Sequence, residues 1–379
     1  MKKILIVVNN VDFFISHRLP IAKKALEEGF QVHVAASGDG GKLKELCPEI
    51  VYHLIDISRS GQNPLLEIRT VYQLYNVYKG VGPDLVHLVT IKPVLYGGIL
   101  ARLTGVKGVL VAISGLGSVF SAVGGLALIR LKVIHGFYKL ALKHRNLDII
   151  FQNECDKKIL LSFIKVEKNR VHLIPGSGVS LDEYQYIPEL DQVPVVSMAA
   201  RLLKEKGVRE FVVAADLLKQ REVRVRMIII GEPDVGNPSS VTLDDISSWK
   251  KRGNVDFLGF RSDINTLYSN CNIVCLPSYY GEGLPKSLVE AAACGRAVVT
   301  TDMPGCRDAI TPDETGILIQ PKNAVELADA IQYLIENPTV RMTMGASGRK
   351  LAEDAFTIES VVEEHMNIYQ ELLGNASEK

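Results

Sequence analysis

The strongest constraint on the fold of this sequence is a regular alternation of short apolar runs with longer amphipathic stretches. Runs such as "LVHLV" (residues 85–89) and "RMIII" (residues 226–230) have the length of β-strands and are too short for buried helices. Segments with helical periodicity lie between such runs, for example residues 19–28, 65–79 and 208–220. Buried strands that alternate with helices form parallel sheets covered by helices on both faces. The sequence therefore predicts an α/β fold.

The predicted strands fall into two series, one in each half of the chain. The polar segment "DEYQYIPELDQVP" (residues 182–194), which carries two prolines, separates the series and is typical of a linker. A chain of 379 residues is also expected to form about two domains. The first series comprises residues 4–8, 31–36, 51–55, 85–89, 108–113, 149–152 and 171–175, and the second comprises residues 193–200, 226–230, 255–260, 272–277, 297–301 and 316–319.

These series predict two doubly wound, Rossmann-like domains that face an interdomain cleft. We expect residues 1–187 to form the N-terminal domain and residues 188–356 to form the C-terminal domain. Ligands of such sheets bind outside the carboxyl ends of the strands. The last segment, residues 357–379, repeats apolar residues at helical intervals, and we expect this helix to pack back on the N-terminal domain.

The composition indicates a globular protein without a bulk preference for nucleic acid, since 43 basic residues balance 43 acidic residues. The six cysteines show no paired spacing, which argues against a zinc site or a disulfide framework and favours a reducing cytoplasm. The start, "MKKILIVVNN", is predicted to be a strand, because its apolar core is short for a signal peptide. Residues 109–129 lack charge over the length of a membrane span, but seven of them are Gly or Ser, which favours a buried strand entering a tight loop.

The stretch "YYGEGLPKSLVEAAACG" (residues 279–295) follows a predicted strand and contains the start of a helix. Pro285 suits the first helical turn, and Gly295 suits the stop after the helix. Backbone N–H groups near Gly283 and Leu284 then lie at the positive end of the helix dipole. The sequence therefore predicts a phosphate-binding site at the start of this helix.

Two carboxylates flank the predicted phosphate-binding site. Glu282 precedes the helix, and Glu290 lies inside it among small apolar residues, so we expect a ligand rather than a protein cation to be the partner of Glu290. Carboxylates accept hydrogen bonds from vicinal hydroxyls, and a phosphate between two hydroxyl-bearing rings is a nucleotide sugar. Taken alone, the stretch is equally compatible with a capped helix that carries two incidental glutamates.

Two cations follow another predicted strand, in "SMAARLLKEKG". Arg201 could bind a diphosphate in bidentate fashion, and Lys206 could bind it as a point charge. Each residue alone is typical of a solvated surface charge. Because both lie at the carboxyl end of a strand in the same predicted sheet as residues 279–295, we favour a diphosphate clamp.

At this point the chain resembles a known family. The motifs "RLLKEKG" and "PSYYGEGLPKSLVEAAACGRAVVTTDMPG" are similar to the donor-site signature of the retaining GT-B glycosyltransferases of family 4, and Glu282 and Glu290 match its E-x7-E motif. The resemblance extends from "HRLPIAKKALEEGFQVHVAA" to the terminal helix. It implies that Arg201 and Lys206 hold the diphosphate, that Glu290 binds the ribose hydroxyls and that Glu282 contacts the transferred sugar.

The resemblance has further implications for the donor site and its chemistry. The loop of Gly259, Phe260 and Arg261 matches the family segment that lies along the nucleobase, usually uracil. Pro285 would begin the helix that faces the phosphates. Members of the family need no metal, and this chain has no Asp-x-Asp to hold one, so we expect no metal and no other cofactor.

Within the family, "SHRLP", "SRSGQNP" and "ISGLGSVF" resemble bacterial surface-polysaccharide enzymes, many of which extend sugars on undecaprenyl diphosphate. One departure is Ser114, which stands where many relatives carry a histidine. Two other histidines are candidates for a role at the site. His87 lies in the apolar run "LVHLV" and favours a core position, whereas His17, beside Arg18, is equally compatible with contact to the sugar or acceptor and with none.

Four residues of the N-terminal half are candidates for acceptor binding. Ser114, Gly115 and Gly117 belong to a turn that permits close approach of a ligand to the backbone. Arg59 could contact an acceptor phosphate. A plain turn and a solvated surface arginine remain equally good interpretations.

A basic stretch, "LALIRLKVIHGFYKLALKHR" (residues 126–145), follows that turn. Basic amphipathic helices can lie on anionic bilayers, which a lipid-linked acceptor would require. The alternative is an ordinary packed helix whose basic side chains reach water. The residues concerned are Arg130, Lys132, Lys139, Lys143 and Arg145, with Phe137 and Tyr138 among them.

The resemblance thus predicts a retaining, metal-independent glycosyltransferase that moves a hexose or N-acetylhexosamine from a UDP-sugar to an undecaprenyl-diphosphate-linked glycan, in the assembly of O-antigen, capsule or another surface polysaccharide. It would act in the cytoplasm, on the inner face of the cytoplasmic membrane. The alternatives are a nucleotide-sugar epimerase of related architecture and a non-catalytic nucleotide-sugar-binding protein. A nicotinamide dehydrogenase is disfavoured, because "ILIVVNNVDFF" lacks Gly-x-Gly-x-x-Gly after the first strand.

Overall fold

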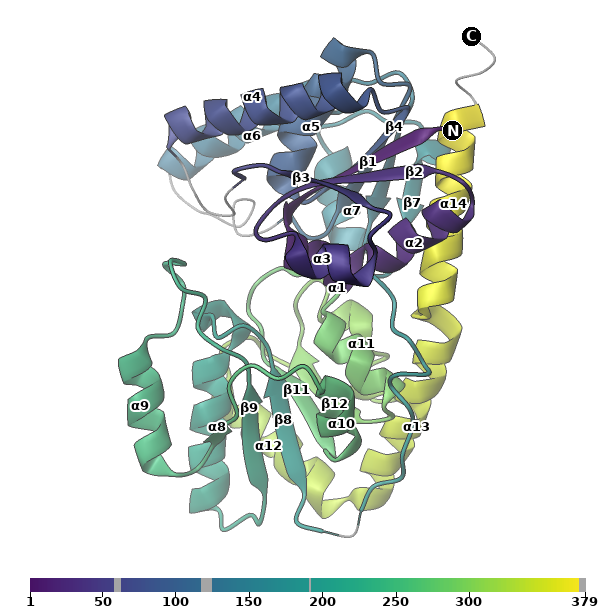
Figure 1. The fold of residues 1–379 in the computed structure, drawn as a ribbon. Helices are drawn as coiled ribbons and strands as arrows, with labels where there is room; N and C mark the ends of the chain where they lie inside the picture. The colour runs from purple at the N-terminus through teal and green to yellow at the C-terminus, as the bar shows by residue number, and fades with distance from the viewer. Residues whose placement is uncertain (58–62, 117–124, 191, 375–379) are drawn as a thin grey trace. The chain divides into compact units, whose positions relative to one another are not determined.

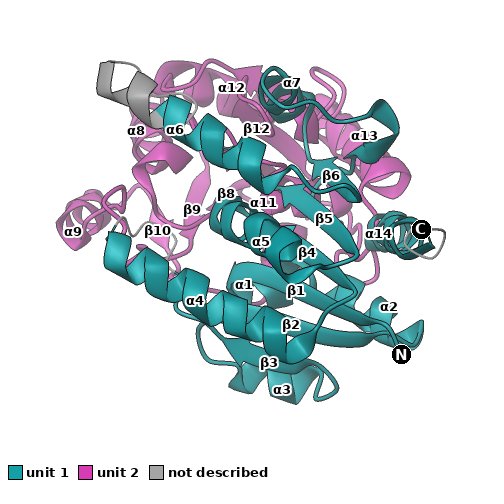
Figure 2. Cartoon of the chain, turned by 90° about the horizontal axis from the view of Figure 1, so that it is seen from above, with its two compact units in different colours: residues 1–177, 358–379 teal, residues 178–357 magenta. Residues whose placement is uncertain are grey.

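The computed structural model describes residues 1–57, 63–116, 125–190 and 192–374 (Figure 1). The chain forms two compact units, one made of residues 1–177 together with the segment from residue 358 onward, and one made of residues 178–357 (Figure 2). The boundary falls after residue 177, whereas the sequence analysis placed it after residue 187. Residues 178–187 therefore group with the second unit.

The first unit is built on a parallel sheet whose described strands follow the order β3-β2-β1-β4-β5-β6-β7. The strand order reverses between β1 and β4, which makes this pair the topological switch point of the sheet. The strands are β1 (Lys3–Asn10), β2 (Gln31–Ser37), β3 (Val51–Leu54), β4 (Leu85–Val89), β5 (Gly108–Ile113), β6 (Leu147–Phe151) and β7 (Val171–Leu173).

Helices cover both faces of this sheet. Helices α1, α2, α3 and α14 contribute buried residues to the core on one face, and α4, α5, α6 and α7 contribute to the core on the other, where α5 lies between α4 and α6 (Figure 2). The bounds are α1 (Val11–His17), α2 (Leu19–Glu27), α3 (Gly41–Leu46), α4 (Pro64–Val81), α5 (Ile91–Thr104), α6 (Gly125–Ala141), α7 (Glu154–Leu161) and α14 (Ile358–Gly374), with a 3₁₀ turn at Lys168–Arg170.

The C-terminal helix α14 packs into the core of the first unit. Met366, Tyr369 and Leu372 are buried there among residues of β1, β2 and α2. The phenol of Tyr369 lies 2.7 Å from Nδ1 of His87, which is fully buried on β4. His87 is therefore a core residue, as its apolar surroundings in the sequence indicated.

The second unit is built on a parallel sheet whose described strands follow the order β10-β9-β8-β11-β12-β13, so that its switch point lies between β8 and β11. The strands are β8 (Val195–Ala199), β9 (Arg226–Ile230), β10 (Asp256–Phe257), β11 (Ile273–Leu276), β12 (Ala297–Thr301) and β13 (Gly316–Ile319). The helices are α8 (Val208–Gln220), α9 (Leu243–Arg252), α10 (Ile264–Ser269), α11 (Lys286–Ala293), α12 (Ala324–Glu336) and α13 (Pro338–Ala355), with 3₁₀ turns η3 (Lys204–Lys206) and η4 (Arg307–Ala309).

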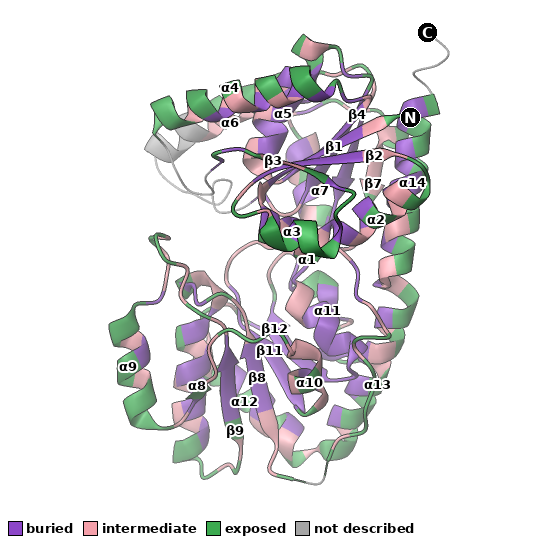
Figure 3. Cartoon of the chain, in the orientation of Figure 1, coloured by how far each residue is buried: buried purple, intermediate pink, exposed green. Residues whose placement is uncertain are grey.

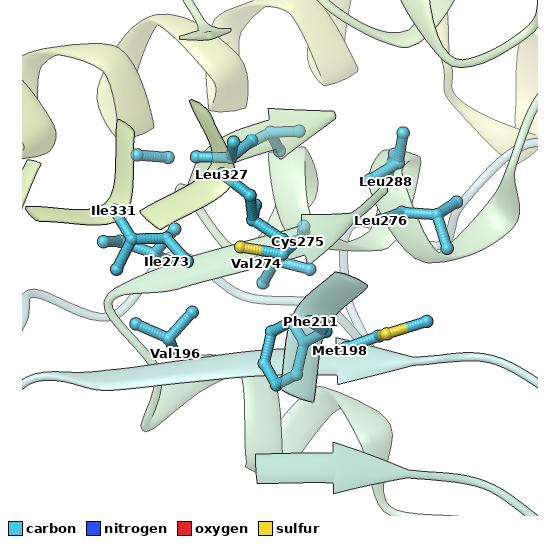
Figure 4. Packing of buried hydrophobic residues seen from close by; sticks show 14 of the residues in the cluster. Val196, Met198, Phe211, Ile273, Val274, Cys275, Leu276, Leu288, Leu327 and Ile331 are labelled. Carbon is cyan, nitrogen blue, oxygen red and sulfur yellow. The ribbon is translucent and has the colours of Figure 1, made fainter. Parts of the chain in front are cut away.

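The central strands of the second unit are buried on both faces (Figure 3). Phe211 of α8 and Met198 of β8 pack together with Val196 and Ile273, and Leu327 and Ile331 of α12 belong to the same cluster (Figure 4). Strands that are apolar on both sides need helices on both faces, which explains why the apolar runs of the sequence do not alternate with polar residues.

The segment before β8 is fixed to the second unit rather than free of it. Glu189 forms an ion pair with Arg341 of α13 at 2.7 Å, and both side chains are nine-tenths buried. The fully buried Arg296 donates a hydrogen bond to the carbonyl oxygen of Ile187. The residues that make these contacts are distant in the sequence. The prolines and polar residues of the segment therefore suggested a flexible linker, whereas the segment is fixed to the second unit.

Two expectations concern the membrane. Within the described part of the chain, no helix combines the length and the apolar character needed to cross a bilayer. Helix α6 exposes Val133, Phe137 and Leu140 together with Lys132 and Lys139. Tyr138, which the sequence analysis grouped with these residues, is instead fully buried in the core of the first unit.

Candidate active site

The loops after β8 and β11 meet at the switch point of the second unit. The backbone N–H of Tyr279, after β11, donates a hydrogen bond of 2.9 Å to the carbonyl oxygen of Glu205 in η3. Gly207 has a φ of +79°, and a Cβ at this position would lie 2.1 Å from the carbonyl oxygen of Pro277. Glycine is therefore required for the two loops to approach this closely.

This approach brings two predicted site residues together. Nζ of Lys206 lies 2.5 Å from Oε1 of Glu282, and the two side chains are only 17% and 13% exposed. The hydroxyl of Ser278 also donates to Oε1 of Glu282, at 3.0 Å. A cation and a carboxylate thus lie side by side at the loop that leads into α11.

The third predicted charge of this region, Arg201, follows β8 and is about half exposed, with a side chain 49% accessible to solvent. It forms an ion pair with Asp234, which follows β9. Asp234 also accepts a hydrogen bond from Nδ2 of Asn237 at 3.2 Å. Because β8 and β9 are neighbours, this pair lies at the same edge of the sheet as Lys206 and Glu282.

The loop that the resemblance assigned to the nucleobase lies at this edge as well. The carbonyl oxygen of Gly259 accepts a hydrogen bond of 2.8 Å from Gly231, which follows β9. Phe260 is 73% exposed, and its backbone N–H lies 3.4 Å from Oε1 of Glu232. Arg261 pairs with Asp263 at 2.5 Å, and hydrogen bonding to this carboxylate raises the pKa of the guanidinium.

Helix α11 begins at Lys286, one residue after the proline that the sequence placed in its first turn. Pro285, with a φ of −65°, is the residue that caps its N-terminus, and Gly295, with a φ of +67°, follows its C-terminal end. Gly283 and Leu284 precede the helix. The loop is held from the other side by Gly305, where a Cβ would lie 2.4 Å from the carbonyl oxygen of Gly283. The first N–H groups of the helix therefore point out at the carboxyl edge of the sheet.

Glu290 lies in the middle of α11 and is 7% exposed. Its Oε1 accepts a hydrogen bond of 2.7 Å from the phenol of Tyr184 and lies 3.5 Å from Nζ of Lys286. Burial raises the pKa of the Glu290 carboxyl, while Lys286 and Tyr184 lower it. The expectation that Glu290 has no protein partner was therefore wrong. Lys286 stands four residues earlier on the same helix, a spacing visible in the sequence, whereas Tyr184 comes from a distant segment.

The described candidates of the first unit lie at or near the carboxyl ends of its strands. His17 ends α1, which follows β1, and its Nδ1 lies 2.6 Å from the hydroxyl of Ser16, while its ring stacks on Phe13. Ser114 and Gly115 directly follow β5, and Gly115 has a φ of +106°. Arg59 and Gly117 lie outside the described residues, so the structure gives no position for them.

Two residues at this edge were missed by the sequence analysis. Asn9 stands near the end of β1, and Thr90 directly follows β4 with a φ of +74°, an uncommon conformation for a β-branched residue. The side-chain oxygens of Asn9, Thr90 and Ser114 are buried and have no hydrogen-bond partner among the described residues. Because β1, β4 and β5 are neighbours, these oxygens lie at adjacent strand ends of one sheet.

Comparison with known proteins defines the class of this chain. Residues 3–153 match the family described as glycosyl transferase 4-like, and residues 184–351 match the glycosyl transferases group 1. The chain is 29% identical over 375 residues to the N,N'-diacetylbacillosaminyl-diphospho-undecaprenol alpha-1,3-N-acetylgalactosaminyltransferase of Campylobacter jejuni, covering 94% of this chain and 96% of that protein.

Solved structures show the same fold. Sucrose-phosphate synthase from Thermosynechococcus elongatus superposes with a TM-score of 0.82 at 19% identity, over 99% of this chain and 100% of the other. Anabaena Alr3699/HepE in complex with UDP-glucose superposes with a TM-score of 0.76 at 19% identity, over 98% and 99% of the two chains.

The chain therefore belongs to the GT-B glycosyltransferases, with a glycosyl transferase 4-like domain followed by a group 1 domain. The resemblance to this family, the two Rossmann-like sheets and the glycosyltransferase activity that the sequence predicted are confirmed.

Proposed function

We propose that this chain is a retaining, metal-independent glycosyltransferase that moves a hexose or N-acetylhexosamine from a UDP-sugar to an undecaprenyl-diphosphate-linked glycan during surface-polysaccharide assembly. The main support for the proposal is the ion pair between Lys206 and Glu282 at the loop that leads into α11. The relative from Campylobacter jejuni, whose name specifies an N-acetylgalactosaminyl transfer to a diphospho-undecaprenol acceptor, supports the substrate classes.

The donor is proposed to bind across the carboxyl edge of the second sheet. A diphosphate competes with Glu282 for Lys206 and with Asp234 for Arg201, since phosphate oxygens are good partners for both cations. The first N–H groups of α11, with Gly283, Leu284 and Pro285 leading into the helix, add the positive end of the helix dipole. The leaving diphosphate is then stabilised mainly by electrostatics.

The other donor contacts follow from the same placement. Glu282, once released from Lys206, contacts the transferred sugar, and Glu290 accepts hydrogen bonds from the ribose hydroxyls. Gly259, Phe260 and Arg261 lie along the base. With no carboxylate assigned as a covalent nucleophile, we propose attack on the same face as the departing phosphate, which retains the anomeric configuration.

The acceptor is proposed to bind the first unit, at the strand ends that carry Ser114 and Gly115, near His17. Arg59 and Gly117 remain candidates for the same role. The exposed basic and apolar residues of α6 are proposed to rest on the anionic inner face of the cytoplasmic membrane. Co-sedimentation with vesicles tests this contact, because Lys132→Glu with Lys139→Glu should reduce binding to vesicles that contain anionic lipid, and equal binding would contradict it.

A transfer assay tests the proposed reaction. The purified protein is incubated with radiolabelled UDP-N-acetylgalactosamine or UDP-glucose and a synthetic undecaprenyl-diphosphate monosaccharide, in buffer with excess EDTA. We expect label in a lipid-linked disaccharide whose new bond has the anomeric configuration of the donor. Inversion of that configuration, or loss of activity with EDTA, would contradict the corresponding part of the proposal. Conversion of the donor without acceptor would identify an epimerase, and donor binding without turnover would identify a binding protein.

A further inference from the structure

The two oxygens of the Glu290 carboxylate are in different situations. Oε1 is held by the phenol of Tyr184 at 2.7 Å and lies 3.5 Å from Nζ of Lys286. Oε2 takes part in neither of these two contacts, and the side chain as a whole is only 10% exposed. Both protein contacts thus converge on one oxygen and leave the second one open to a hydrogen-bond donor.

Tyr184 is itself fixed at two points. Its carbonyl oxygen accepts a hydrogen bond of 2.8 Å from Nη1 of Arg349, and the same nitrogen donates to the carbonyl oxygen of Ala293 at the end of α11, also at 2.8 Å. The neighbouring Tyr186 packs over Gly295, where a Cβ would lie 2.2 Å from its ring. The phenol therefore reaches Glu290 from a segment that is tied to α11, the helix that carries Glu290.

The protonation of the two partners suits this contact. Burial, together with the Glu290 charge, raises the pKa of the Tyr184 phenol well above its usual value, so the phenol stays protonated and can only donate to the carboxylate. A fixed donor on Oε1 limits rotation of the carboxylate, and limiting such rotation before binding reduces the entropy that binding costs.

We propose that Tyr184 is a positioning residue for the donor: its phenol holds Oε1 of Glu290 and thereby presents Oε2 to the vicinal hydroxyls of the ribose. This inference rests on the proposed function, because it assumes that a nucleotide diphosphate binds at α11. It adds a residue outside the donor-site motif, from the segment that the sequence analysis read as a linker.

Several other titratable groups lie near Glu290, and two of them, Lys286 and Glu183, affect its pKa. The groups are Lys286 and Cys294 of the α11 segment, Glu183 beside Tyr184, and Tyr268 of α10. Burial raises the pKa of Glu290, Glu183 raises it further, and Lys286 and Tyr184 lower it. Loss of the phenol therefore raises the pKa of Glu290, and as pH falls the ionised form, which accepts hydrogen bonds from hydroxyl groups, is lost at a higher pH.

The test replaces Tyr184 by Phe, which keeps the ring and removes the hydroxyl. With a UDP-sugar as the varied substrate, we expect Tyr184→Phe to raise KM about tenfold with little change in kcat, because it weakens a hydrogen bond to a charged group. We also expect the acid limb of kcat/KM to move to higher pH. Tyr268→Phe is the matched control, since it removes a buried phenol that has no hydrogen-bond partner among the described residues.

A binding measurement separates positioning from a general loss of structure. Calorimetry with UDP and 2'-deoxy-UDP gives a ratio of dissociation constants within each variant, and this ratio does not depend on the fraction of protein that is folded. Wild type should prefer UDP about tenfold, and Tyr184→Phe should lose most of that preference while Tyr268→Phe retains it. The loss of preference would show that the phenol acts through the ribose contact.

Two outcomes would overturn the inference. One is an unchanged ratio and an unchanged acid limb in Tyr184→Phe. The other is a lower melting temperature and kcat with the ratio intact, which would make Tyr184 merely structural. Failure of the proposed function has a different signature, namely a wild-type protein that binds neither UDP nor 2'-deoxy-UDP.

Discussion

The two sheets of this glycosyltransferase present different chemistry at their switch points. In the second unit, the loops after β8 and β11 carry charged residues in pairs, Lys206 with Glu282 and Arg201 with Asp234. In the first unit, the ends of β1, β4 and β5 carry neutral polar residues whose buried oxygens lack partners among the described residues. Among the described residues, the second unit therefore places paired charges at its switch point, whereas the ends of β1, β4 and β5 in the first unit carry neutral oxygens.

The difference indicates which part of a substrate each edge suits. Cations that lie beside carboxylates can exchange those partners for a diphosphate, so that the cations stay paired when the donor binds. Neutral oxygens such as those of Thr90 and Ser114 cannot balance a phosphate but can bond the hydroxyls of a sugar. Unsatisfied buried polar atoms destabilise a fold, and such atoms in a native structure often mark a site of function.

The largest expected effect lies at the charged edge. Lys206→Ala should lower kcat/KM for transfer by about 10²–10³, the usual cost of removing one group that stabilises developing negative charge. Steady-state transfer kinetics measure this. The matched control is Lys204→Ala, which removes an exposed lysine from the same 3₁₀ turn and should have little effect. Equal losses of kcat/KM in the two variants would contradict a specific role of Lys206, because the loss would then follow from net charge rather than from position.

A second effect concerns the buried carboxylate of α11. Glu290→Gln should weaken UDP binding about tenfold, because a neutral amide oxygen is a poorer acceptor for ribose hydroxyls. The same change should raise the melting temperature at pH 7. Burial raises the pKa of Glu290, so the stability associated with its protonated form is present at low pH and is lost as pH rises through that pKa. Calorimetry and thermal unfolding measure the two quantities, and a less stable variant would contradict this sign.

A smaller effect is expected at the neutral edge. Thr90→Val keeps the shape of the side chain and removes a hydroxyl without a partner among the described residues. It should raise the KM for the lipid-linked acceptor about threefold to tenfold, leave the KM for the donor unchanged and preserve or raise the melting temperature. A change in the donor KM alone would reverse the assignment of the two edges. Ser114→Ala offers an independent check at the neighbouring strand end.

The smallest expected effect is an increase in the affinity for UDP. Asp234→Asn removes the carboxylate that pairs with Arg201 and so frees the guanidinium for a diphosphate. Exposed ion pairs contribute up to about 1 kcal/mol, so UDP affinity should rise by at most about fivefold. Asp302→Asn, which breaks an exposed pair with Arg307, is the control and should not change affinity. Weaker UDP binding in Asp234→Asn would argue that Arg201 does not contact the diphosphate.

Much of the fold could be predicted from the sequence because the information is local. Each apolar run corresponds to a strand, and β4, β5, β9, β12 and β13 have the predicted bounds. Helix α11 begins within one residue of the predicted position, at Lys286. Short-range periodicity and turn residues encode these elements, so no knowledge of tertiary contacts was needed.

The parts that could not be predicted depend on contacts between distant segments. Tyr184 and Glu290 are 106 residues apart, and no local pattern links them. The same holds for Glu189 and Arg341, whose buried pair fixes the segment read as a linker. Most of what was missed at the site depends on tertiary contacts that the sequence does not show. In one case, Lys286, a contact at helical spacing was visible in the sequence and was overlooked.

The most direct test of the account is a crystal structure of the protein with UDP. We expect the diphosphate to lie within hydrogen-bond distance of Arg201, Lys206 and the first N–H groups of α11, and the ribose hydroxyls to bind Oε2 of Glu290. A nucleotide bound far from Arg201 and Glu290 would contradict the central claim that the charged edge of the second unit binds the donor.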